Sequence, residues 1–123
     1  MAGNEDAPKV LVVAARQPAL VELLQEAGFA VDARTRPVQP REAVEADVAV
    51  VFRGRLIGRS QASSLAEQGV HVIEILTVDP PSPSTSSWLR LSNRITKSDL
   101  VQIVRAVAHW TREGAALAAT QAA

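Results

Sequence analysis

The chain has 123 residues, of which 47% are hydrophobic and 21% charged, and its 13 basic and 13 acidic residues give a formal net charge of 0. This length suits a single hydrophobic core, and the balanced charge argues against non-specific binding to nucleic acid or to a membrane surface. The chain has no cysteine, which excludes disulfides, thiol catalysis and thiolate metal sites and fits a cytoplasmic protein.

The first quarter of the chain predicts a tail, a strand and a helix. Residues 1–8 are polar and predict a flexible tail, and the apolar run KVLVVAA at 9–15 has the length of a buried strand. A helix is expected over 17–28, because Pro18 suits a first helical turn and Gly28 is a natural stop. No apolar run approaches the ~20 residues that a membrane span needs.

The middle of the chain repeats the alternation of strands and helices. The alternating segment FAVDAR at 29–34 predicts a second strand, and REAVEA at 41–46 predicts one or two helical turns. The run DVAVVF at 47–52 is apolar enough for a strand buried on both faces. A helix over 59–69 and a fourth strand over 70–78 are expected to follow.

The last third holds a proline-rich loop, a short strand and the clearest helix. Three prolines and four serines in 79–87 exclude a helix there, and residues 88–92 alternate as a fifth strand. The final helix begins near Thr96, and Asp99 three residues later makes a weaker form of the capping box. The Ala-rich segment 114–123 predicts a tail, a linker or the frayed end of this helix. An apolar stripe is expected along the helix at Leu100, Ile103, Val104, Val107 and Trp110.

Strands that alternate with helices favour parallel pairing, because the crossovers then place helices on both faces of the sheet. We therefore expect one three-layer α/β/α domain over 9–113. Its five-stranded parallel sheet is expected in the order 2-1-3-4-5, with the Pro/Ser loop 79–87 in place of a fourth helix.

The pattern from Lys9 to Trp110 resembles the flavodoxin-like receiver domain of two-component response regulators. Receivers open on an aliphatic strand that ends in two acids and is soon followed by a proline and a helix, and VLVVAARQP is similar in shape. Asp47 stands five positions before Phe52, the spacing at which receivers carry an Asp before their phosphoacceptor. Thr77 stands where receivers end their fourth strand in Thr or Ser, and Asn93 stands where they carry a lysine.

The residues that would perform receiver chemistry are nevertheless missing. The resemblance places the magnesium-binding acids on Ala14 and Ala15, and it places the phosphoacceptor on Phe52, or on Arg53 if the register shifts by one. Phosphoryl transfer to a carboxylate needs a nucleophilic acid and acidic metal ligands. We therefore expect no enzyme activity, no cofactor and no metal, as in pseudo-receivers, which keep the fold and lose aspartyl phosphorylation. The positions of this degenerate pocket are Ala14, Ala15, Phe52, Thr77 and Asn93.

Arginines gather where the predicted strands reach their carboxyl ends, the edge at which open α/β sheets bind ligands. Guanidinium groups grip phosphate and carboxylate groups with two parallel hydrogen bonds. An anion-binding rim is one interpretation, and solvated loop charges, some paired with Glu or Asp, are the other. The arginines of this rim are Arg16, Arg53, Arg55, Arg59 and Arg94.

The two tryptophans also have two interpretations. Core packing is the default for Trp88 and Trp110, and an interface on the last strand and helix, including one with a second copy of the chain, is the alternative. The function expected is a non-catalytic signalling or scaffold module that acts through protein–protein contacts, with no nucleic acid or membrane partner. The alternative function is a binding domain that holds a phosphorylated small molecule or a nucleotide through the arginine rim.

Overall fold

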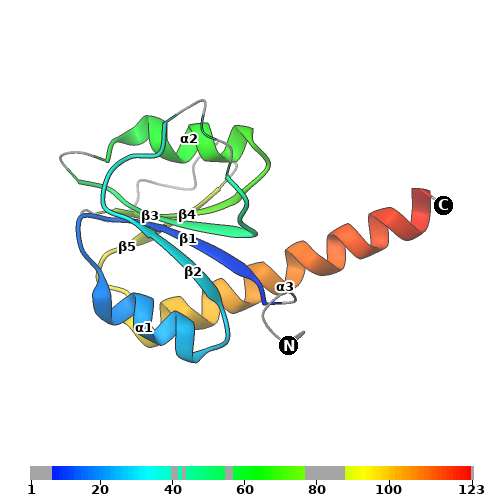
Figure 1. Ribbon diagram of the computed structural model, residues 1–123, viewed down its shortest axis with the longest axis horizontal. Helices are drawn as coiled ribbons and strands as arrows, with labels where there is room; N and C mark the ends of the chain where they lie inside the picture. Colours follow the sequence, from blue (N-terminus) through cyan, green and yellow to red (C-terminus); the bar gives the residue numbers. More distant parts are fainter. Residues whose placement is uncertain (1–6, 40–41, 43, 55–56, 77–87, 123) are drawn as a thin grey trace.

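The computed structural model describes residues 7–39, 42, 44–54, 57–76 and 88–122, with the side chains of Arg59 and of 111–122 outside that description. Five strands form one fully parallel sheet in the order β2-β1-β3-β4-β5 (Figure 1). This flavodoxin-like α/β arrangement confirms the predicted fold class and strand order. The strands are β1 (Lys9–Val13), β2 (Ala30–Arg34), β3 (Val48–Phe52), β4 (His71–Leu76) and β5 (Leu89–Ser92).

In the described ranges, three helices cover the two faces of this sheet (Figure 1). The helices α1 (Pro18–Glu26) and α3 (Lys97–Ala122) pack on one face, and α2 (Arg59–Glu67) packs on the other. Successive residues of a strand point to opposite faces, so a sheet covered on both sides needs strands that are apolar throughout. The run Val48–Val51 meets this need, and its four side chains are fully buried.

The predicted ends of α1 and α2 and the predicted starts of α1 and α3 are confirmed. Pro18 occupies the first turn of α1, and Gly28 and Gly69 follow α1 and α2 with φ angles of 98° and 86°. Only glycine adopts such angles without strain, which explains why both helices stop there. At the start of α3, the backbone N–H of Asp99 donates to Thr96 Oγ1 at 3.1 Å, the expected cap.

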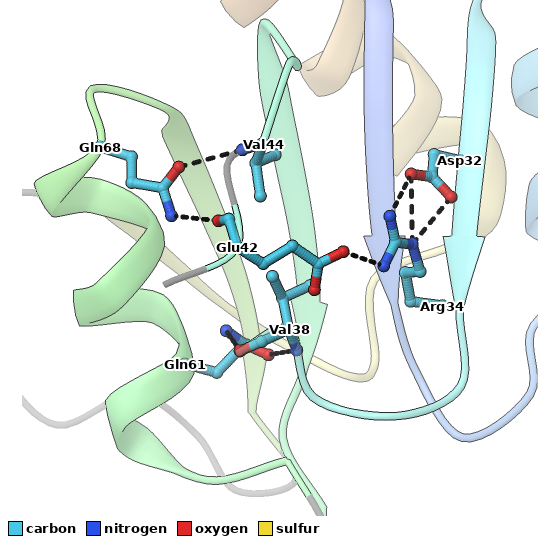
Figure 2. Close-up of polar contacts among 7 residues, drawn as sticks. All are labelled: Asp32, Arg34, Val38, Glu42, Val44, Gln61 and Gln68. Atoms are coloured by element: carbon cyan, nitrogen blue, oxygen red, sulfur yellow. Dashed lines mark hydrogen bonds and ion pairs between the residues drawn. The ribbon is translucent and has the colours of Figure 1, made fainter. Parts of the chain in front are cut away.

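The connection from β2 to β3 corrects one prediction, because its described residues within 41–46 form no helix. Gln61 of α2 and Gln68, which caps the end of α2, bind its backbone instead (Figure 2). The amide of Gln61 accepts from the N–H of Val38 at 2.6 Å and donates to its carbonyl at 3.3 Å. Gln68 accepts from Val44 N–H at 3.1 Å and donates to the Glu42 carbonyl at 3.0 Å. Side chains thus satisfy backbone groups of this connection in place of backbone partners.

The same connection is tied to β2 and to the core. Val38 is buried against α2 and the sheet. Arg34 Nη1 donates to Glu42 Oε1 at 2.6 Å, and its Nε donates to Asp32 Oδ1 at 3.1 Å (Figure 2). Hydrogen bonds to Asp32 and then to Glu42 raise the pKa of Arg34. The described residues of this connection are therefore tied to both β2 and α2.

Helix α3 is longer than the sheet it covers, and its C-terminal half runs past the edge of the domain (Figure 1). Its helical backbone continues through the Ala-rich segment to Ala122. Leu100 and Val104 of the predicted stripe are buried, but Trp110 is 74% exposed, so core packing was the wrong default for this residue. Among the described residues, no helix is both long enough and apolar enough to cross a membrane.

Candidate functional site

A cavity of about 750 Å³ lies at the carboxyl edge of the sheet, and we call it the edge cavity. Its lining comes from the residues after β1 and β3, from the starts of α1 and α3, and from β4 and the turn after β5. Parallel strands all end at this edge, which is where open α/β sheets place their ligands. The cavity therefore lies where the sequence predicts a site.

The edge cavity brings together six of the ten residues predicted for the degenerate pocket and the arginine rim. Arg16 and Arg53 of the predicted rim line it, but Arg94 does not. Thr77 and Arg55 lie outside the described residues, and Arg59 begins α2 with a side chain that is not described. Four of the five degenerate-pocket positions also line it, namely Ala14, Ala15, Phe52 and Asn93.

Apolar side chains occupy the positions where the receiver resemblance implies acids. Ala14 is buried, and Phe52 is half-buried against the core shared by the sheet, α1 and α3. No carboxylate is present among the described residues that line the edge cavity. Across the described part of the chain, no cluster of three His, Asp or Glu side chains could hold a metal ion. These residues cannot supply a nucleophilic acid or a hard-cation site.

All charged side chains among the described residues that line the edge cavity are basic. Arg16 follows β1 and Lys97 begins α3, and both side chains are exposed. Neither has a salt bridge to any residue in the described ranges. Asn93, Gln17 and Thr35 add polar groups beside them. The result is a cavity with positive charge at its rim and no described acid to offset it.

The third basic residue, Arg53, is engaged by a buried acid that sequence reasoning missed. Glu74 lies in β4 with a fully buried side chain, beside Arg90 on β5. Its Oε2 accepts from Arg53 Nη1 at 3.2 Å, and its Oε1 accepts from Arg90 Nε at 3.1 Å and from Trp88 Nε1 at 3.2 Å. We call these four residues the Glu74 cluster. Because a buried carboxylate is costly unless it is paired and hydrogen-bonded, the cluster explains how Glu74 is tolerated in the core.

The Glu74 cluster explains the environments of two predicted site residues, Arg53 and Trp88. Arg53 is a paired charge rather than a free anion ligand, as the second interpretation of the rim expected. Trp88 is half-buried, bonded to Glu74, and stacked under the guanidinium of Arg90 at 5.6 Å from the ring centroid. One sequence signal was available, since Glu74 is the only charged residue inside the run VIEIL.

A second cavity, of about 480 Å³, lies beside β1 and β2 and differs in its charges. Its acids and bases neutralise one another, because Lys9 Nζ lies 3.5 Å from Glu45 Oε2 and Arg34 Nε lies 3.1 Å from Asp32 Oδ1. The edge cavity is therefore the better candidate for a charged ligand.

Comparison with known proteins does not assign the chain to a family. No protein-family model matches the chain, and no curated protein sequence matches it. The flavodoxin-like fold stands on the sheet order and helix placement, and the likeness to receivers stays a prediction from the residues.

Proposed function

We propose that this domain is a non-catalytic regulatory module of pseudo-receiver type, which takes up no phosphoryl group. The observation that carries the proposal is the edge cavity: Phe52 and Ala14 line it, at the positions where the receiver resemblance implies acids, and no described lining residue is an acid. A receiver switches by forming an acyl phosphate on a carboxylate, with a metal ion beside it. The described residues that line the edge cavity offer neither the carboxylate nor the metal ligands for that reaction.

The buried Glu74 does not replace the missing acid. It does not line the edge cavity, and its two oxygens already accept three hydrogen bonds. A carboxylate held in this way is a weak nucleophile, because its lone pairs are engaged by positive donors. The described residues thus favour binding over phosphoryl transfer.

Incubation with acetyl phosphate and magnesium is expected to leave the mass of the intact protein unchanged. Titration with magnesium and beryllofluoride is likewise expected to give no saturable NMR shifts at Ala14 and Phe52, which line the edge cavity. A phosphorylatable receiver treated in parallel provides the positive control. A stoichiometric phosphoryl adduct would contradict the proposal.

The contact surface in this proposal is α3. Trp110 is the most exposed large hydrophobic side chain among the described residues, at 74%, and it lies on a helix that runs past the sheet (Figure 1). Exposed tryptophans of this kind are enriched at the centres of protein interfaces. We propose that this helix face pairs with a second copy of the chain.

The variant Trp110→Ala is expected to weaken self-association while changing the unfolding free energy by no more than about 0.5 kcal/mol, because the side chain is exposed. Sedimentation equilibrium measures the association, and urea unfolding measures the stability. Gln102→Ala, an exposed change on the same helix, is the matched control. A wild type that stays monomeric at every concentration would refute pairing through α3.

A further inference from the structure

We infer that the edge cavity binds an organic anion, a small molecule that carries a carboxylate, phosphate or sulfonate group on an apolar body. This inference rests on the proposed function, since it fills the cavity that the proposal leaves without an acid. It goes further by naming what the cavity holds. Three properties of the cavity support it: size, wall and charge.

The size of the edge cavity suits a whole small molecule. Its volume of about 750 Å³ falls within the ~300–1,000 Å³ typical of small-molecule sites. An inorganic phosphate ion would occupy only a small part of this space. The cavity therefore favours a ligand with a body as well as a charged group.

The wall of the edge cavity is largely apolar and belongs to the core. Leu20, Ile75 and Leu100 are buried at 0–3% exposure, and Phe52 and Ile95 pack beside them as partly buried residues. The three buried side chains form the floor of the cavity from the core side, and the partly buried Phe52 and Ile95 present apolar surface to its interior. An apolar body placed against them would leave water without forcing the core to rearrange. A purely polar ligand would gain nothing from this wall.

The charge of the edge cavity selects an anion. Arg16 and Lys97 have no salt bridge within the described part of the chain. The Glu74 cluster adds to this bias, because it sets two arginines against one carboxylate and so leaves a positive charge in excess. Its Arg53 also lines the cavity, held in place by Glu74. A cationic ligand would be repelled, and a neutral one would leave these groups unmatched.

The test uses two fluorescent probes of similar shape and different charge. Anilinonaphthalene sulfonate combines an aromatic body with an anion, and phenylnaphthylamine has a similar body without charge. We expect one saturable site for the sulfonate, with affinity at least about tenfold above that of the neutral probe. Inorganic phosphate alone is expected to compete only weakly, because it leaves the apolar wall empty.

Substitutions in and outside the edge cavity test whether the probes bind there. Arg16→Ala and Lys97→Ala are each expected to weaken sulfonate binding about three- to tenfold and to leave the neutral probe unchanged. Ala15→Phe, on the cavity lining, is expected to block both probes. Arg105→Ala removes an exposed charge of α3 that does not line the cavity, and it should change neither. Thermal unfolding of each variant confirms that it is folded.

Equal affinity for the two probes, or sulfonate binding unaffected by both Arg16→Ala and Lys97→Ala, would overturn the inference. The proposed function is tested separately by acetyl phosphate. A phosphoryl adduct with sulfonate binding intact would remove the proposed function alone. Absence of both the adduct and a saturable sulfonate site would remove this inference alone.

Discussion

Replacement of Glu74 by glutamine is expected to lower the unfolding free energy by about 3–5 kcal/mol, the range seen when one partner of a buried ion pair is removed. The side chain is fully buried, and its carboxylate is the shared acceptor for Arg53, Arg90 and Trp88. Glutamine keeps the shape but loses the charge. The NH2 group of the new side chain would face N–H groups that need an acceptor, so hydrogen bonds would be lost. Both arginines would also lose their counter-charge.

Urea unfolding followed by far-UV circular dichroism measures this loss. Glu67→Gln makes the same chemical change at an exposed position of α2, and it is expected to alter stability by no more than about 0.5 kcal/mol. If Glu74→Gln is as stable as the control, the Glu74 cluster contributes nothing to folding.

A second variant separates charge burial from packing. The triple change of Glu74→Leu, Arg53→Met and Arg90→Met removes every charge of the cluster and keeps similar side-chain volumes. Replacing a whole buried ion network by apolar groups is often neutral. We therefore expect this variant to recover most of the stability that Glu74→Gln loses.

Gln61→Ala has the second largest expected effect, a loss of about 2–3 kcal/mol, since it leaves a buried backbone donor and acceptor without partners. The amide of Gln61 is 4% exposed and binds both the N–H and the carbonyl of Val38 (Figure 2). Val38 itself is buried, so water cannot readily replace the lost bonds. The loss is measured by urea unfolding, and amide hydrogen exchange at Val38 should accelerate.

Gln68→Ala is a closely matched control for Gln61→Ala. Gln68 makes the same pair of hydrogen bonds, to Val44 and Glu42, but it is exposed. Water can replace its bonds, and we expect a loss of about 1 kcal/mol. Equal losses for the two variants would show that burial does not set the strength of these contacts.

The sheet could be predicted because each strand is encoded by its own residues. Runs such as Val48–Val51 are apolar at every position, which only a strand buried on both faces requires. The positions of Gly28 and Gly69 separate helices from strands at their correct points. The same register brought Ala14 and Phe52 to one cavity, so the location of the site followed from the sheet.

The connection between β2 and β3 could not be predicted in the same way. Its Glu and Ala residues favour helix locally, and that preference is worth only a few tenths of a kcal/mol per residue. The bonds that override it come from Gln61 and Gln68, more than 20 positions along the chain. Local propensity contains no record of such distant partners.

The pairing of Arg53 was missed for a related reason. Arg53 and Glu74 are 21 positions apart and meet only because β3 and β4 are neighbours in a particular register. An arginine after a strand has the same sequence signature whether it is free or paired. The exposure of Trp110 could not be predicted either, because an apolar stripe on a helix does not show how much of the helix is covered by the sheet.

The unequal environments of the two tryptophans have an optical consequence. The chain has no tyrosine and two tryptophans, so its near-ultraviolet emission comes from Trp88 and Trp110. In the monomer, Trp110 already faces solvent before unfolding, whereas Trp88 would lose its contacts with Glu74 and Arg90 on unfolding. A change in intrinsic fluorescence on unfolding therefore reports chiefly on the region of the edge strand β5. It reports on unfolding of the whole domain only if β5 unfolds together with the rest of the sheet.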